Sequence, residues 1–167
     1  MRNRRSQNTR VLGIAPSSRG FGFAVMEGVG TLVDWGVKSL KGDKNASSLS
    51  NLASLIRHYR PDTIALEDVS AKRARRGSRV KALLIEIVAL SAGEGIRAKA
   101  FSMRKVRRAA VPEGEATEHA LAAVLAACFP DQLGFRLPKK RRPWTSEDYR
   151  MDIFDAVALA AHSLRDV

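Results

Sequence analysis

The order of the short apolar segments along the chain constrains the fold most strongly. Three strand-like segments, 11–15, 21–27 and 31–39, come first and are separated only by turn-forming residues such as Pro16 and the tripeptide 28–30. Strands joined by loops this short are antiparallel neighbours in a sheet. Helical and strand-like segments alternate further along, which favours parallel crossover connections. The sequence therefore predicts an α/β fold: a mixed five-stranded sheet of three antiparallel strands followed by parallel crossovers, flanked by helices.

The boundaries of the later elements follow from capping residues and from prolines and glycines. Ser47 or Ser48 is expected to cap a helix that runs to about Tyr59, and 63–67 is the fourth strand. The remaining predicted elements are a helix at 80–90, a strand at 96–101, a short helix capped by Ser102, a helix at 116–129, a long loop at 130–144 and a helix from Thr145 or Ser146 to about Leu164.

The chain length fits one domain rather than two, with 167 residues. Residues 1–10 are predicted to form a flexible basic tail, and 11–167 the single domain. The one cysteine, Cys128, permits no internal disulfide and is expected to be a core thiol. No apolar run has the length of a membrane span or the position of a signal peptide, so a cytoplasmic protein is expected.

The net charge indicates a polyanionic partner. Lys and Arg number 29 against 17 Asp and Glu, which gives a formal charge of +12. Binding to phosphates releases counterions and explains such a surplus. A membrane surface would attract the same charge, but the sequence has no basic amphipathic helix with Trp or Phe on its apolar face and no lipidation motif. Nucleic acid is therefore the predicted partner.

Three carboxylates are candidates for a site. Glu67 ends an otherwise apolar strand, where α/β sheets place ligands, although a solvated strand end would look the same. Asp152 and Asp155 lie three residues apart in a predicted helix and so share one face. A divalent cation or an arginine would relieve their repulsion, whereas a polar stripe on a surface helix is the alternative interpretation.

Basic side chains gather in several segments and are candidates for phosphate contacts, with a solvated loop as the alternative. The predicted nucleic-acid-binding residues are Arg19, Lys72, Arg73, Arg75, Arg76, Arg79, Arg104, Arg107, Lys139, Lys140, Arg141 and Arg142.

Five segments resemble motifs of the RuvC family of Holliday-junction resolvases, within the RNase H-like nuclease superfamily. That family has G-I-D-P-G-S-R on its first strand, a glutamate on its fourth strand and D-x-x-D-A-x-A-x-A on its final helix. The matching segments, in the family's order, are 11–19, 21–25, 65–69, 101–107 and 152–160. The resemblance implies an RNase H-like fold over most of the chain.

The resemblance also implies an activity and a site. In the family, four carboxylates hold two Mg²⁺ ions that activate water for phosphodiester cleavage of branched DNA. By resemblance, Glu67, Asp152 and Asp155 are three of the four metal-binding, catalytic residues, with Mg²⁺ or Mn²⁺ as cofactor. The family acts as a homodimer, which implies an interface through helix 80–90. Its candidate face is Val80, Leu83, Leu84 and Ile87, which would equally serve a monomer core.

Three positions differ from the family pattern. Ala15 stands where the family has its first-strand aspartate, Ser70 where many members have an aromatic residue, and Glu118 where the family has a lysine. These differences predict that cleavage is impaired or absent. The sequence leaves three functions open: a weak or inactivated Mg²⁺-dependent endonuclease, a non-catalytic structure-selective DNA- or RNA-binding protein, and a subunit of a larger complex.

Overall fold

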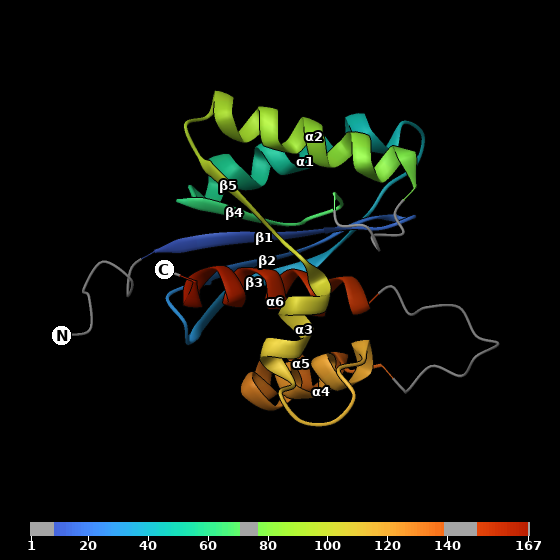
Figure 1. Cartoon of the computed structure of the whole chain (residues 1–167). Coiled ribbons are helices and arrows are strands. Elements are labelled where there is room, and N and C mark those ends of the chain that lie inside the picture. Colours follow the sequence, from blue (N-terminus) through green and yellow to red (C-terminus); the bar gives the residue numbers. More distant parts are fainter. Residues whose placement is uncertain (1–8, 71–76, 139–149, 167) are drawn as a thin grey trace.

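A five-stranded mixed sheet with helices on both faces forms the molecule (Figure 1). The computed structural model describes residues 9–70, 77–138 and 150–166. The strands are β1 (Arg10–Pro16), β2 (Gly20–Glu27), β3 (Thr31–Ser39), β4 (Thr63–Glu67) and β5 (Arg97–Phe101), in the spatial order β3-β2-β1-β4-β5. The first three strands are antiparallel, whereas β4 pairs in parallel with both β1 and β5. This confirms the predicted sheet.

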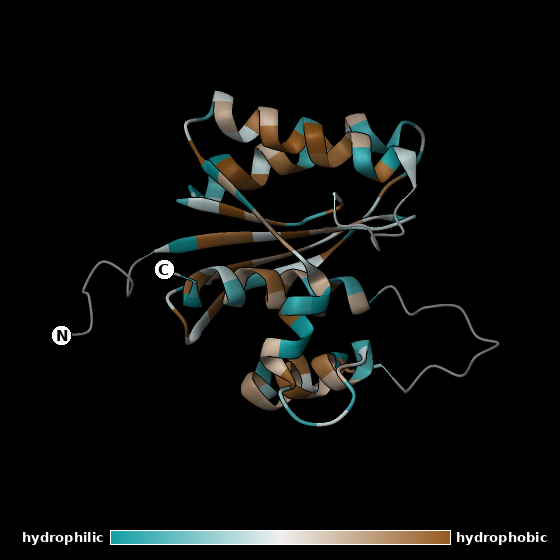
Figure 2. Ribbon diagram, in the orientation of Figure 1, coloured by the Kyte–Doolittle hydropathy of each residue, from teal (hydrophilic) through white to brown (hydrophobic). Residues whose placement is uncertain are grey.

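Helices α1 (Lys44–Tyr59) and α2 (Ser78–Gly93) cover one face of the sheet. Helix α6 (Met151–Arg165) crosses the other face, and α3 (Met103–Ala110), α4 (Glu118–Cys128), α5 (Pro130–Leu133) and the 3-10 turn η1 (Gly134–Arg136) lie beyond it. Alternate residues of β1, β2 and β4 point into two apolar cores, one on each face. Figure 2 shows this pattern as hydrophobic residues along the central strands and α6.

Several predicted boundaries need correction. Asp43, rather than Ser47 or Ser48, caps α1, because its carboxylate accepts a hydrogen bond from the amide of Ala46 at 3.1 Å. The helix expected at 116–129 is α4, capped by Thr117, and the loop expected at 130–144 begins instead with α5 and η1. The predicted start of the last helix at Thr145 or Ser146 lies outside the described residues.

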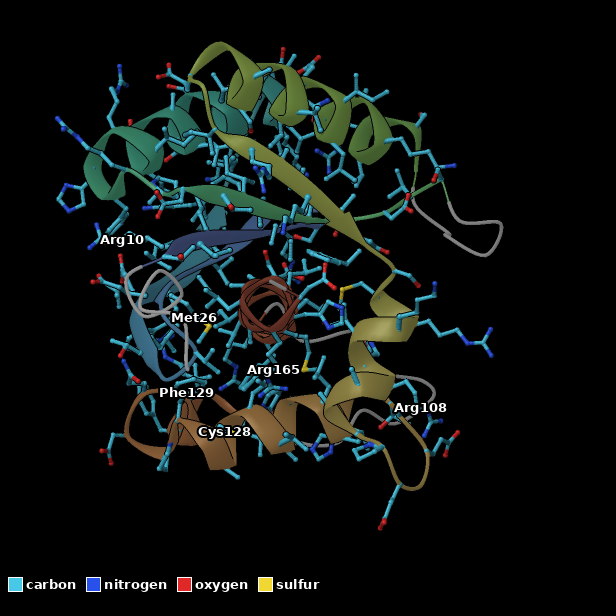
Figure 3. All side chains as sticks on the ribbon, turned by 60° about the vertical axis from the view of Figure 1, so that its left-hand side comes forward. Arg10, Met26, Arg108, Cys128, Phe129 and Arg165 are labelled. Carbon is cyan, nitrogen blue, oxygen red and sulfur yellow. The ribbon has the colours of Figure 1, made fainter. Side chains whose placement is uncertain are left out.

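Cys128 is exposed, so the prediction of a core thiol is wrong. It ends α4, whose buried residues are Leu121, Ala122, Leu125 and Ala126, one helical face. Figure 3 shows α4 as an outer helix with Cys128 at one end, whereas Met26 on β2 belongs to the core beneath α6. No helix of the described ranges is long and apolar enough to span a bilayer.

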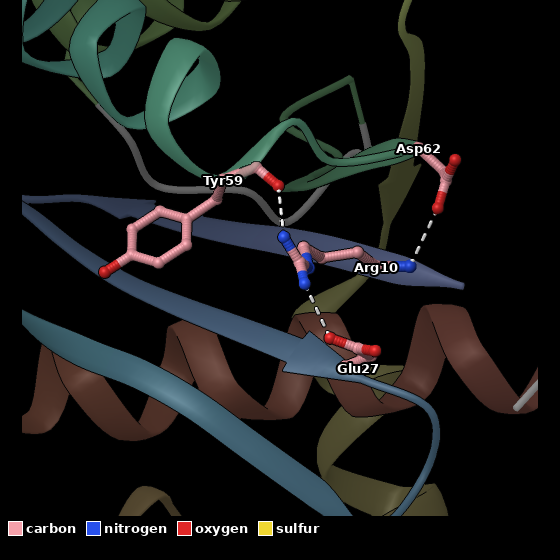
Figure 4. A network of polar contacts seen from close by, with 4 residues as sticks. All are labelled: Arg10, Glu27, Tyr59 and Asp62. Carbon is pink, nitrogen blue, oxygen red and sulfur yellow. Dashed lines mark hydrogen bonds and ion pairs between the residues drawn. The ribbon is translucent and has the colours of Figure 1, made fainter. Parts of the chain in front are cut away.

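Arg10 ties the start of β1 to its neighbours (Figure 4). Its guanidinium donates to the carbonyl of Tyr59 at 2.6 Å and to the carboxylate of Glu27 at 2.7 Å. Its backbone amide donates to Asp62 at 2.9 Å. The network joins β1, β2 and the end of α1, and it holds the end of β1 that lies away from Ala15.

Candidate functional site

Ala15 and Glu67 lie at the same edge of the sheet and on the same face. In the parallel pair of β1 and β4, Gly13 is opposite Ala65, so two residues further on Ala15 and Glu67 are at one level. Both Ala15 and Ala65 belong to the core beneath α6, and Glu67 shares the orientation of Ala65 because strand residues alternate. The first-strand position and the strand-end glutamate are therefore neighbours, as a shared site requires.

Helix α6 brings Asp152 to this edge. Gly22 on β2 is opposite Ala15, and a Cβ atom added to Gly22 would lie 2.3 Å from the carbonyl oxygen of Asp152 and 2.7 Å from its Cβ. Such distances are possible only because Gly22 has no side chain. The start of α6 consequently lies directly against the strand pair that carries Ala15.

Asp155 lies one helical turn along α6 from Asp152 and is 5% exposed. Its neighbours Phe154, Ala156 and Val157 are fully buried. Its Oδ1 atom has no contact with solvent. Burying a carboxylate costs free energy unless it is compensated, so Asp155 depends on a compensating contact at the sheet–helix interface.

The carboxylates that remain do not by themselves form a metal cage. Among residues 9–70, 77–138 and 150–166, no three His, Cys, Asp or Glu side chains are arranged to hold a metal ion. Ala15 contributes no side-chain oxygen at the edge where Glu67 and Asp152 lie. The donor set therefore does not fit the two-ion site that the resemblance implies, and the assignment of Glu67, Asp152 and Asp155 as metal ligands stays a prediction.

Ser70, at one of the three differing positions, stabilises the turn after β4. Its hydroxyl and amide donate to Oδ1 of Asp68 at 2.6 and 2.9 Å. The hydroxyl's hydrogen bond is the main reason that the pKa of Asp68 lies below its usual value, and the amide adds to it. The turn beyond Glu67 therefore keeps a charged carboxylate. An aromatic residue at position 70 would lack the hydroxyl that Ser70 donates to it.

The basic residues named from the sequence have different surroundings. Arg19 and Arg104 are exposed, at the β1–β2 turn and at the start of α3. Arg107 forms an ion pair with Glu118 at 3.2 Å, so Glu118 offsets a cation on the adjacent helix. Arg79 is half-buried and bonded to Ser17 and Asn45. The others, which lie outside the described residues, are Lys72, Arg73, Arg75, Arg76, Lys139, Lys140, Arg141 and Arg142.

Sequence reasoning missed Lys44 and Asn45, which contact the β1–β2 turn and Arg79. Both precede the helix start predicted at Ser47 or Ser48, yet they begin α1. No pattern in the sequence links them to residues so distant along the chain.

Comparison with known proteins identifies the fold. No family model and no curated protein sequence matches the chain. Thermus thermophilus RuvC matches with a TM-score of 0.68 and 20% identity over 95% of both chains. The same protein in complex with a Holliday junction substrate gives 0.68 and 19% over 95% of this chain and 94% of that one. The yeast mitochondrial Holliday junction resolvase matches with a TM-score of 0.62 and 14% identity, over 95% of this chain and 78% of that one. The chain thus has the RuvC-like fold, which confirms the predicted fold class.

Proposed function

We propose that this chain binds branched DNA at the edge of the sheet where Ala15 and Glu67 lie, beside Asp152 of α6. One observation supports it above the others: the register places Ala15 beside Glu67, and Gly22 admits Asp152 to the same edge. The fold is shared with RuvC, which has been seen with a Holliday junction substrate. The charge of +12 favours a phosphate backbone as partner.

Cleavage is the ancestral activity in this proposal, and it is impaired or absent because Ala15 supplies no carboxylate. Glu67, Asp152 and Asp155 are the residues that would hold Mg²⁺ or Mn²⁺ in a complete site, since hard cations prefer carboxylate oxygens. The exposed cations Arg19 and Arg104 are proposed phosphate contacts. A protein that binds without cutting is the second candidate, and the same vacant carboxylate position favours it.

A binding and cleavage assay tests the proposal. The wild type, Ala15→Asp and the uncharged control Ala15→Asn are incubated with four-way junction, linear duplex, single-stranded DNA and RNA, with Mg²⁺ or Mn²⁺. We expect salt-dependent binding that prefers the junction for all three proteins, and cutting by Ala15→Asp alone. Cutting by wild type would show that Ala15 does not disable the site. Absence of binding to every nucleic acid would reject the proposal and favour a role as a subunit of a larger complex.

We propose, as a separate point, that two copies associate through α2. The residues predicted for that interface, Val80, Leu83, Leu84 and Ile87, are buried within the single chain and serve its core. The apolar side chains that α2 does expose are Ile85 (71%) and Val88 (48%). Light scattering on wild type and Ile85→Glu tests this: a dimer that the variant converts to a monomer supports it, and a monomeric wild type rejects it.

A further inference from the structure

The turn that follows Ala15 is anchored through its carbonyl groups. Three successive carbonyls accept hydrogen bonds from three different parts of the chain. Arg79 Nη2 donates to Ser17 at 2.7 Å, Lys44 Nζ to Ser18 at 2.5 Å, and the amide of Leu40 to Arg19 at 2.8 Å. The amide of Ser17 closes the turn on the carbonyl of Gly20 at 2.9 Å. The backbone of the turn is therefore held from the starts of α1 and α2 and from the end of β3.

Arg79 is itself fixed by Asn45. Its Nη1 donates to Asn45 Oδ1 at 3.0 Å, and Asn45 Nδ2 donates back to the carbonyl of Arg79 at 3.1 Å. The reciprocal pair holds the guanidinium in one orientation, in which Nη2 reaches Ser17. Hydrogen bonds from a charged donor are stronger than neutral ones, and half-burial protects them from screening. Replacing them with a phosphate contact would leave protein acceptors without their donor.

The position of Arg79 relates these bonds to the candidate site. Ser17 lies two residues after Ala15, and Arg79 lies in the first turn of α2, the helix that follows β4 and Glu67. One side chain thus joins the segments that leave the two adjacent strand ends. Arg19, an exposed cation, lies within the turn that is held.

We infer that Arg79 is a positioning residue that holds the β1–β2 turn at the edge of the nucleic-acid site, and that it does not contact phosphate. The inference deepens the proposed function and rests on it for the site. Arg79 acts through Ser17 and the turn, so its loss loosens the turn and weakens binding without removing a phosphate contact. If Arg79 instead contacted phosphate directly, its loss would leave the turn unchanged and would alter the salt dependence of binding.

Hydrogen exchange measures the turn without any nucleic acid. The probes are the amides of Ser17 and Leu40, which bond to the carbonyls of Gly20 and Arg19. We expect exchange about tenfold faster in Arg79→Gln, the order of the effect of one lost charged hydrogen bond. Arg79→Lys keeps the charge but cannot reach Ser17 and Asn45 together, so it should not restore protection. Asn45→Ala should raise exchange at the same amides, and Arg104→Gln, at the start of α3, should not.

The salt dependence of junction binding supplies the second measurement. Each phosphate contact contributes about 0.9 to the slope of log affinity against log salt concentration. We expect Arg104→Gln to reduce the slope by about this amount. Arg79→Gln and Arg79→Lys should weaken binding with the wild-type slope.

The outcomes separate the inference from the proposed function. Unchanged exchange in both Arg79 variants, or a slope reduced by about 0.9 in Arg79→Gln with wild-type exchange, would overturn the inference. Wild-type protein that binds no nucleic acid would overturn the proposed function, whatever the exchange rates show. Circular dichroism of every variant verifies that the fold is retained. If an Arg79 variant does not fold, Asn45→Ala tests the same hydrogen bonds.

Discussion

Gly22 and Asp152 are packed so closely that a methyl group on Gly22 would lie 2.7 Å from the Cβ of Asp152. Gly13 has the same relationship to α6, since its added Cβ would lie 2.1 Å from the carbonyl oxygen of Ala156. Two glycines on adjacent strands thus let the helix backbone approach the sheet. The placement of Asp152 beside Ala15 depends on this approach.

Gly22→Ala should therefore destabilise the protein by about 2 kcal/mol, the usual cost of forcing extra volume into a packed interface. The backbone atoms of Asp152 cannot move aside as a flexible side chain could. Urea denaturation gives the free energy of unfolding. Gly30→Ala is the matched control, because nothing lies within 4 Å of its added Cβ. Equal stability of the two variants would show that α6 does not pack as closely as described.

Ala15→Asp should lower the melting temperature in EDTA and regain stability with Mg²⁺ or Mn²⁺. Ala15 is 4% exposed and lies beside Glu67 and Asp152, so an added carboxylate would meet like charges in a poorly solvated position. A cation at a hundredfold excess over its Kd would restore about 2.7 kcal/mol. Thermal scans of wild type, Ala15→Asp and Ala15→Asn provide the comparison. The same metal response from Ala15→Asn would contradict the prediction.

Much of the fold follows from local pattern. The turns at Pro16 and 28–30 and the end of the fourth strand at Glu67 follow from residues adjacent to them, and the antiparallel and parallel pairing of the strands follows from connection lengths. Because Glu67 ends a buried strand, its place at the sheet edge could also be predicted. Local chemistry decides these features, so a single sequence carries the information.

The rest depends on contacts between distant residues. The sequence predicts Arg79 to be one of several phosphate-binding cations in a basic segment. Its partners Asn45 and Ser17, however, lie 34 and 62 residues away along the chain. Likewise, Asp43, Ser47 and Ser48 are all acceptable helix caps by residue type, but Ser47 and Ser48 lie inside α1, which begins at Lys44. Packing decides which polar group contacts which partner. The residues next to each group in the sequence do not contain this information.

Cys128 should react rapidly with a thiol reagent such as Ellman's reagent in the native protein. The apolar run that surrounds it in sequence predicted burial, but α4 buries one face only and the thiol lies outside it. The rate under native conditions is compared with the rate in denaturant. A native rate lower by several orders of magnitude would mean that Cys128 is buried after all, whereas an exposed thiol gives similar rates in both.

Tyr59 should ionise well above the usual range for a phenol. Its hydroxyl donates to Asp34, and this hydrogen bond, with burial and the charge of Asp34 in support, raises the pKa of Tyr59 from 10.0 to about 12. Ultraviolet titration of wild type against Tyr59→Phe isolates this group from Tyr149. Asp34→Asn should bring the pKa back toward its ordinary value.

The raised pKa also sets how Tyr59 affects stability at alkaline pH. Between pH 10 and 12 the folded protein retains a proton that the unfolded chain has lost. Unfolding in this range releases that proton, so rising pH favours the unfolded state. The stabilisation is complete below pH 10 and is lost as the pH rises through about 12. Unfolding free energies should therefore fall more steeply for wild type than for Tyr59→Phe over this interval; parallel curves would show that the hydrogen bond to Asp34 does not form in solution.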